Sequence, residues 1–387
     1  MPWSETCPME QRARFVLDAL QGHFTMSELC YRYGVSRKTG YKWIERYHGE
    51  GAAGCADRLR APKVHPNRTK AKVVAKVVWA RRKHPGWGPR TLHAFLVREY
   101  PHVSWPCPST IGEILKRHGL VRKRRRRRSP TPWRTARTRA DRPNRIWTAD
   151  FKGQFRLGNG ALCYPLTVAD AFSRYLLVCR ALKSTAVRPA RRVFEAAFRE
   201  YGLPDVIHTD NGVPFCAPGS LLALSTLSVW FLKLGIALER SRPGKPQDNG
   251  SHERMHRTLK EEVAHPPRRT PAAQQRALDR FRQHYNEERP HHALELQTPN
   301  RHYAPSARPY PEDVPEPVYP THFEVRRVTK IGVVTWKQKR IFLSAALGNE
   351  PVGFEHIADG LWSVFFGEVM LGRLYESESR IVVGVGR

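Results

Sequence analysis

The sequence has no apolar run that approaches the roughly 18 residues of a membrane span, so we expect no transmembrane segment. Its start, MPWSETCPMEQRARF, lacks the apolar stretch of a secretory signal peptide. The seven cysteines are scattered through 387 residues without a CxxC pair, which argues against a structural zinc site and favours a reducing cytoplasm. The 17 histidines show no metal-ligand spacing, and we expect most of them to lie at the surface or to face phosphates.

Acidic residues are few relative to basic ones. The chain has 66 Lys and Arg against 35 Asp and Glu, a net charge of +31, and residues 1–143 contribute +22 of that charge. Such a balance indicates a polyanionic partner, and nucleic acid is the simplest one. We therefore expect a nucleic-acid-binding N-terminal part ahead of a more neutral body.

Residues 1–60 are predicted to form a helix-turn-helix DNA-binding domain. Thr25 and Glu28 have the spacing of a capping box, and Ser36 is placed to cap the next helix. Two helices joined by a short glycine turn, the second basic at its front, are typical of this motif. The DNA-contact candidates on the second helix are Arg37, Lys38 and Lys42. The alternative is an ordinary three-helix bundle.

Residues 61–120 are predicted to form a second helical DNA-binding domain. Its last helix is expected over 108–120, with Thr110 and Glu113 as another capping box and with Lys116 and Arg117 as DNA contacts. A purely structural bundle is the alternative.

Residues 121–143 are predicted to be a basic linker, because they combine a run of arginines with three prolines. Arg124, Arg125 and Arg126 are candidates to neutralise DNA phosphates, which makes binding depend steeply on salt. The alternative is a passive spacer.

The pattern changes to alternating strands and helices over 144–305, which predicts an α/β domain around one sheet. From 320 to 387, short strands separated by turn signals predict a small all-β barrel.

Three acidic residues of the α/β domain stand out. Asp150 interrupts the strand-like stretch IWTADFKGQF, where a buried charge is costly without a partner. Asp210 ends a short strand and enters DNG, which is also a common turn signal. Glu253 lies in the first turn of a helix, where the helix dipole alone favours an acid. Together, three carboxylates converging on one sheet edge are suited to hold two hard divalent cations.

The segments WTADFKG, HTDNG, NGSHERMHRTLKEE and YNEERPHHAL resemble the integrase core of bacterial insertion-sequence transposases, which are relatives of retroviral integrases. The segments HPGWGPRTLHAFL and STIGEILKRHGL resemble the helix-turn-helix regions that precede such cores. The resemblance covers nearly the whole chain. The 43 positions from Asp210 to Glu253 exceed the retroviral spacing, and residues 216–235 supply the extra length.

The resemblance implies an RNase H-like core with a mixed five-stranded sheet and flanking helices. It implies that Asp150, Asp210 and Glu253 are catalytic and bind two Mg²⁺ ions, with Mn²⁺ as a possible substitute. Asp170 resembles the structural hairpin aspartate of the family, and Asp248, Glu261 and Glu262 fit the triad less well. Lys260 lies seven residues beyond Glu253, within about 20° of the same helical face, and is a candidate to contact DNA; a solvated lysine is the alternative. Arg254, His256 and Arg257 are candidates to bind phosphates; ordinary surface roles are the alternative.

The predicted function is a DDE transposase of the bacterial cytoplasm, associated with the nucleoid. It would bind the terminal inverted repeats of a mobile element, cleave DNA strands and join them to target DNA, acting as a dimer or higher homo-oligomer. The alternatives are a non-catalytic DNA-binding regulator and an RNase H-like nuclease without joining activity. No residue-level explanation follows for YNEERPHH beyond packing at a helix end.

Overall fold

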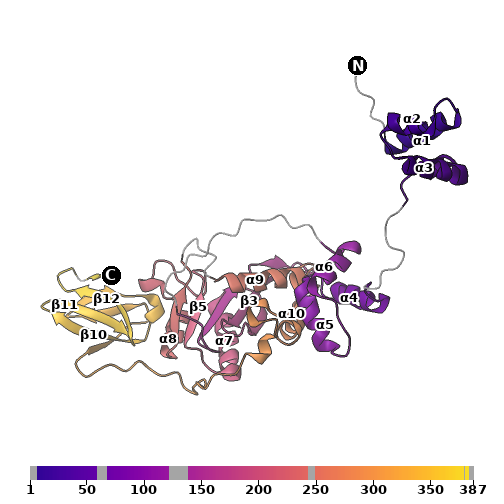
Figure 1. Cartoon of the computed structure of the whole chain (residues 1–387). Helices are drawn as coiled ribbons and strands as arrows, with labels where there is room; N and C mark the ends of the chain where they lie inside the picture. The colour runs from indigo at the N-terminus through magenta and orange to yellow at the C-terminus, as the bar shows by residue number, and fades with distance from the viewer. Residues whose placement is uncertain (1–6, 59–67, 122–137, 243–248, 379, 383–387) are drawn as a thin grey trace. The chain divides into compact units, whose positions relative to one another are not determined.

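We analysed a computed structural model, which describes residues 7–58, 68–121, 138–242, 249–378 and 380–382 (Figure 1). The chain divides into two compact units, Met1–Thr69 and Lys70–Arg387. No helix within the described ranges is long and apolar enough to cross a membrane. Arg124, Arg125 and Arg126 of the predicted linker lie outside the described residues.

The first unit is a helical domain with a helix-turn-helix arrangement. Its helices are α1 (Pro8–Leu20), α2 (Met26–Tyr33) and α3 (Arg37–Glu50). The predicted capping box of Thr25 and Glu28 is present, and Ser36 caps α3 by accepting from the backbone N–H of Thr39. Gly40 brings α3 close to its neighbours, since a Cβ there would lie 2.8 Å from the ring of Phe15. The local helix signals of this region were therefore read correctly.

The second unit begins with three helices that share an apolar core. They are α4 (Ala71–Lys83), α5 (Pro89–Glu99) and α6 (Pro108–Arg117). Trp87, Leu92 and Ile111 are fully buried between them. The capping box predicted for α6 is wrong: Cys107 is the N-cap, and Thr110 lies inside the helix. Pro108 determines the start, because proline is favoured at the first helical position.

The central domain is built on one mixed sheet. Its strands are β1 (Ile146–Phe151), β2 (Phe155–Arg156), β3 (Leu162–Asp170), β4 (Leu176–Leu182), β5 (Val206–Thr209) and β6 (Ala237–Arg240). The five longer strands follow the order β4-β3-β1-β5-β6. The β1, β3 and β4 strands are antiparallel neighbours, whereas β5 runs parallel to β1 and to β6. This is the mixed five-stranded arrangement expected of an RNase H-like core, with the short β2 added beside β3.

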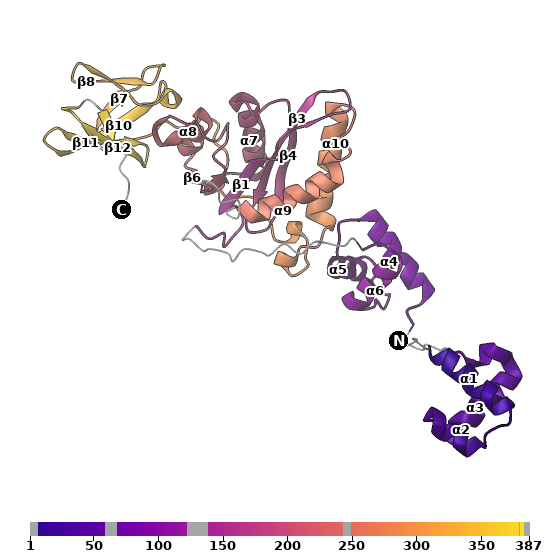
Figure 2. The same ribbon diagram turned by 90° about the horizontal axis from the view of Figure 1, so that it is seen from above.

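Helices cover both faces of this sheet (Figure 2). On one face, α7 (Val187–Tyr201) and α8 (Thr226–Lys233) pack against Trp147 and Ala149 of β1. On the other, α9 (Gly250–Leu259) and α10 (Pro271–Gln283) pack against Leu176 and β4. Because successive strand residues point to opposite faces, Thr148 and Asp150 of β1 point toward α9.

Residues 216–235, which the sequence indicated as the extra length between Asp210 and Glu253, include α8. Leu227, Trp230 and Phe231 of this helix join the core of the central domain. Val229 packs with the C-terminal strands instead, and Lys233 pairs with Glu350 at 3.0 Å. The insertion therefore packs against both the central sheet and the C-terminal region.

The C-terminal region is all-β, as predicted. Its strands are β7 (Glu324–Arg327), β8 (Val333–Trp336), β9 (Lys339–Phe342), β10 (Pro351–Ala358), β11 (Leu361–Phe366), β12 (Val369–Tyr375) and β13 (Arg380–Val382). In the described residues they form a five-stranded sheet, β13-β12-β11-β10-β7, and a two-stranded sheet, β8-β9. Trp336 and Trp362, one from each sheet, both donate to Glu376 Oε1. The predicted fold class is confirmed: a helical region, a mixed α/β core and an all-β end.

Candidate active site at the ends of two parallel strands

Asp150 and Asp210 lie at the same end of two neighbouring strands. The register of β1 and β5 pairs Ala149 with Thr209, so the next position brings Asp150 beside Asp210. Neighbouring strands are about 4.8 Å apart, which makes the two acids direct neighbours. Asp210 Oδ1 also accepts the Gly212 backbone N–H at 3.0 Å, so the DNG segment is a turn as well. A Cβ at position 212 would lie only 3.0 Å from Asp210 Oδ2, and this close approach favours glycine there.

The carboxyl group of Asp150 is electrostatically strained. Its pKa is raised from 3.8 to about 7, mainly by burial, next by the negative charge of Asp210 and to a smaller extent by Glu253. Lys152 partly opposes this increase. The three predicted ligands therefore interact electrostatically, although they come from different parts of the chain. A cation placed among them would relieve the repulsion.

Glu253 lies on the exposed side of α9. The opposite side of that helix, made by His252, Met255, His256 and Leu259, is buried against the sheet. In the described part of the chain, the donor atoms gathered within 4.8 Å of one another at this edge belong to Asp150, His252 and His256. Asp210 and Glu253 are exposed, so their side chains have freedom to turn toward an ion beside Asp150.

Two histidines and two threonines form a buried network below Asp150. His252 contacts Thr148 Oγ1 through Nδ1 at 2.9 Å and Thr167 Oγ1 through Nε2 at 2.7 Å. The His256 Nε2 atom also lies 2.7 Å from Thr167 Oγ1, whose single proton is donated to the Asp150 backbone carbonyl at 3.0 Å. Both imidazoles must then donate to Thr167 through Nε2–H.

This network determines which atom His256 presents to Asp150. Burial lowers the pKa of His252 to about 3 and that of His256 to about 2, so both rings are neutral and carry one N–H each. With its proton on Nε2, His256 directs an Nδ1 lone pair toward Asp150 Oδ2, 3.6 Å away. Two electron-rich atoms facing each other provide an environment that suits a cation.

The prediction that His256 faces phosphates is wrong, since its side chain is buried. His252 was not identified as a site residue at all. The signal was available in the sequence: residues 252, 255, 256 and 259 follow the spacing of one buried helix face. His84 and His208 are also buried and are exceptions to the expectation that most histidines lie at the surface.

Asp170 has the structural role expected of it. It is 1% exposed, and its carboxylate accepts from the backbone N–H of Asn144 and from both the N–H and the hydroxyl of Ser173. These bonds hold the β3–β4 turn to the start of β1. Among the other rival acids, Asp248 lies outside the described residues, and Glu261 and Glu262 follow α9 in the π-helical turn η4 (Lys260–Ala264).

The basic residues proposed for DNA binding in the described ranges are exposed. On α9 and just after it, Glu253, Arg254, Arg257 and Lys260 share the side that faces away from the sheet. The other exposed candidates are Arg37, Lys38 and Lys42 on α3, and Lys116 and Arg117 at the end of α6. Exposure is compatible with DNA contact, and the contact itself stays a prediction.

The YNEERPHH motif packs at a helix end, as expected by default, and the structure identifies the partner of its asparagine. Asn286 accepts from the backbone N–H of Leu176 at 2.8 Å and donates to its carbonyl at 3.0 Å. The β3–β4 hairpin shifts register at this point, between Val168 and Ala169. The amide of Asn286 thus bonds both backbone groups of Leu176 beside the irregularity.

We expect Asn286→Ala to lower the free energy of unfolding by about 2–4 kcal/mol, because a buried N–H and a buried C=O lose their partner. Gln283→Ala, at an exposed position on α10, is the matched control and should change stability by less than about 0.5 kcal/mol. Urea denaturation measures both. Equal stability of the two variants would contradict the role given to Asn286.

Asp150 is expected to destabilise the fold when no cation is present. A carboxyl group whose folded pKa is raised binds more protons in the folded state, so stability falls as pH rises from about 4 to about 7. In EDTA, the free energy of unfolding of Asp150→Asn should therefore exceed that of the wild type by an amount that grows with pH. The difference should be on the order of a few kcal/mol at pH 8. Thermal unfolding at pH 5 and pH 8 tests this, and an equal effect at both values would count against a strained carboxylate.

Comparison with known families agrees with this geometry. Residues 140–246 and 234–299 each match an integrase core domain family. The α/β domain of this chain is thus similar to an integrase core domain along residues 140–299. Residues 11–63 match a helix-turn-helix domain and residues 39–115 a homeodomain-like domain. The residues matched by the integrase core family include Asp150, Asp210 and Glu253, and the helix-turn-helix matches precede them.

Individual relatives come from mobile elements and retroviruses. The chain is 29% identical over 238 residues to an uncharacterized 31.7 kDa protein of insertion element IS407 from Burkholderia multivorans, a match that covers 61% of this chain and 81% of that protein. It is 35% identical over 126 residues to the Pol polyprotein of feline endogenous virus ECE1, which covers 32% of this chain but only 11% of the polyprotein.

Solved structures that resemble the chain are retroviral. The intasome of simian T-cell lymphotropic virus has a TM-score of 0.37 at 19% identity, covering 76% of this chain and 97% of the intasome chain. The HTLV-2 integrase catalytic core domain in complex with magnesium has a TM-score of 0.34 at 18% identity, covering 43% of this chain and all of that one.

Proposed function

We propose that this protein is the transposase of a bacterial insertion element. It binds the terminal inverted repeats of the element, cleaves DNA strands there and joins the released ends to target DNA. The observation that carries the proposal is that Asp150 and Asp210 each follow the last registered pair of β1 and β5, Ala149 and Thr209, with Glu253 interacting electrostatically with Asp150 from α9. The chain acts as a dimer or higher homo-oligomer, because two element ends must be handled together.

The carboxylates of Asp150, Asp210 and Glu253 are the proposed ligands of two Mg²⁺ ions, which Mn²⁺ can replace. The donor set fits, because hard divalent cations prefer oxygen ligands and Asp150 is held in a strained, electron-rich position. When bound, such a pair of cations activates the attacking oxygen and stabilises the leaving oxygen in phosphodiester cleavage.

The other residues of the site are proposed to hold the carboxylates in place and to contact the DNA. The buried network of His252, His256 and Thr167 holds α9 against the sheet, so that Glu253 stays beside the aspartates. Arg254, Arg257 and Lys260 line the exposed side of the same segment and are the proposed phosphate contacts next to the triad. Attack by water first exposes a 3′-hydroxyl, and that hydroxyl then attacks the target DNA.

The helical domains are proposed to recognise the element ends. Exposed Arg37, Lys38 and Lys42 lie at the front of α3, the second helix of the motif, which is the helix that enters the major groove in such domains. The action of the protein on chromosomal DNA implies a cytoplasmic, nucleoid-associated location.

One experiment tests the proposal against its alternatives. The purified chain is incubated with Mg²⁺, a labelled pre-cut element end and a target plasmid, and the products are separated on a denaturing gel. Joined products are expected. Hydrolysis without joining would indicate a nuclease, and end binding without any cleavage would indicate a regulator; either outcome would overturn the proposal.

A further inference from the structure

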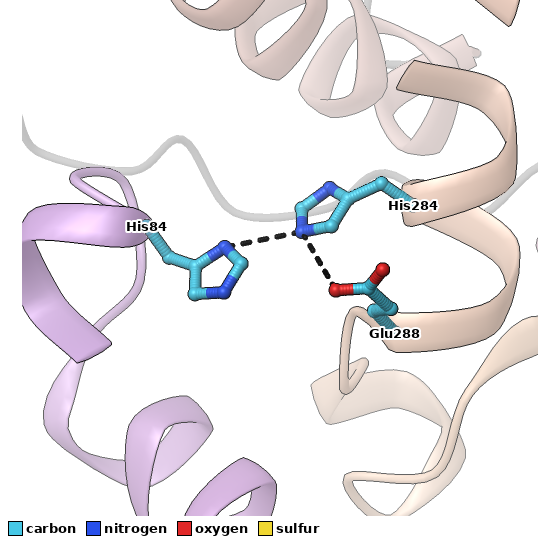
Figure 3. A group of neighbouring side chains, drawn as sticks. All are labelled: His84, His284 and Glu288. Atoms are coloured by element: carbon cyan, nitrogen blue, oxygen red, sulfur yellow. Dashed lines mark hydrogen bonds and ion pairs between the residues drawn. The ribbon is translucent and has the colours of Figure 1, made fainter. Parts of the chain in front are cut away.

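A second group of metal-binding side chains lies away from the carboxylates, where the α4–α6 helices meet the integrase core. His84 follows α4, whereas His284 and Glu288 belong to the π-helical turn η5 (His284–Glu288) that continues α10. Their donor atoms lie within 4.8 Å of one another. Figure 3 shows His284 turned toward both partners, with one ring nitrogen facing His84 and Glu288 together.

The distances are close to those that an ion needs. The Nε2 atom of His284 lies 3.1 Å from His84 Nδ1 and 4.0 Å from Glu288 Oε2. Two ligands of a tetrahedral zinc ion, each at about 2.0 Å, are about 3.3 Å apart. The separation of the two nitrogens therefore already suits an ion, which would replace the proton that they share in their hydrogen bond. The separation between Glu288 Oε2 and His284 Nε2 must shorten by less than about 1 Å, which the half-exposed side chain of Glu288 allows.

The surroundings support an ion at this position. The Nδ1 atom of His284 faces Glu262 Oε2 at 3.8 Å, and Arg289 in turn contacts Glu262 at 3.2 Å. A carboxylate behind a ligating histidine is the usual second partner in zinc sites, because it fixes the tautomer that leaves the other nitrogen free to bind.

An ion can also reach the cluster. All three residues line a cavity of about 820 Å³, which leaves room for a water molecule as a fourth ligand. Lys83 competes with a metal ion for the carboxylate of Glu288. Its Nζ atom lies 3.9 Å from Glu288 Oε2, and both side chains are nearly half exposed. Such an exposed pair contributes about 1 kcal/mol or less, so a metal ion displaces it readily.

We propose that His84, His284 and Glu288 bind one zinc ion, or a similar borderline transition metal, that fastens the α4–α6 helices to the integrase core. Two imidazole nitrogens and one carboxylate oxygen suit Zn²⁺ or Co²⁺ and are a poor set for Mg²⁺. The site is thus chemically distinct from the three-carboxylate edge. It has no local spacing in the sequence, because His84 and His284 are 200 positions apart.

The test uses the full chain, stripped of metal and kept in excess Mg²⁺ to saturate the carboxylates. Co²⁺ is then titrated while visible absorption is recorded, since tetrahedral Co²⁺ gives intense bands. One equivalent is expected to bind, and Zn²⁺ is expected to displace it. His284→Gln, Glu288→Gln and His84→Gln should each weaken binding at least about tenfold, and Glu262→Gln by about 10- to 100-fold.

Controls separate this site from others. Asp150→Asn and His102→Gln, an exposed histidine of the same helical region, should leave the Co²⁺ spectrum and affinity unchanged. Circular dichroism confirms that each variant is folded, and the half-exposed Glu288 gives a variant that does not disturb the buried ring of His84. Absence of the bands, their persistence in both His284→Gln and Glu288→Gln, or their loss in Asp150→Asn would overturn the proposal.

Discussion

Asp150→Asn is expected to reduce cation-dependent cleavage and joining by about 10³-fold or more, while binding to element ends changes little. A catalytic cation stabilises transition-state charge by several kcal/mol, and each 1.36 kcal/mol corresponds to about tenfold in rate. The asparagine keeps the shape of the side chain but removes the negative charge with which Asp150 would bind a cation together with Asp210 and Glu253. Glu253→Gln should have the same effect.

Single-turnover assays on labelled element ends measure this loss, and gel shifts measure end binding. Glu261→Gln is the matched control, because it removes an exposed carboxylate shortly after α9 and should retain activity within about twofold. Full activity of Asp150→Asn, or an equal loss in Glu261→Gln, would remove the assignment of Asp150.

Salt is expected to have an effect of similar size on DNA binding. A protein that contacts six to ten phosphates loses about 10³- to 10⁵-fold in affinity between about 50 and 200 mM salt. Replacing Arg124, Arg125 and Arg126 with glutamine should lower the slope of log K against log salt by about 0.9 for each arginine that contacts a phosphate.

The matched control replaces three exposed arginines of α7 and α10, namely Arg188, Arg192 and Arg276. The net charge changes equally in both triple variants, so a difference between them reports position rather than total charge. Fluorescence anisotropy over a salt series measures both slopes. An unchanged slope in the Arg124–Arg126 variant would mean that this segment is a passive spacer.

The sequence predicted the order of the elements well, because local signals determine them. Thr25 and Glu28 form the predicted capping box, and the alternating stretch around Asp150 is a strand. The wrong start predicted for α6 also has a local cause. Both Pro108 and Thr110 are residues that favour a helix start, and the helix begins at Pro108. Where a residue has a strong backbone preference, the sequence pattern was sufficient to predict the secondary structure.

The candidate site was only partly predictable. A carboxylate in a strand interior is anomalous in the sequence itself, and so Asp150 could be found. His252 and His256 were missed because histidine is compatible with a surface as well as a core. Their burial depends on Thr148 and Thr167, which lie on two neighbouring strands about 100 positions earlier.

The contacts between elements far apart in the sequence could not be predicted at all. Asn286 pairs with Leu176, 110 positions away, and Arg98 Nη2 donates to the carbonyl of Glu288 at 2.9 Å, 190 positions away. No local periodicity encodes such pairs, because they depend on how separate elements pack. The YNEERPHH motif was recognisable as a pattern, yet its packing role becomes clear only from these contacts.

The central claim is that Asp150, Asp210 and Glu253 together bind divalent cations. Anomalous diffraction from crystals of the protein bound to an element end and Mn²⁺ tests it most directly. We predict two anomalous peaks a few ångströms apart, both within bonding distance of Asp150 and each also contacting Asp210 or Glu253. Peaks found elsewhere in the chain, with none beside Asp150, would contradict it.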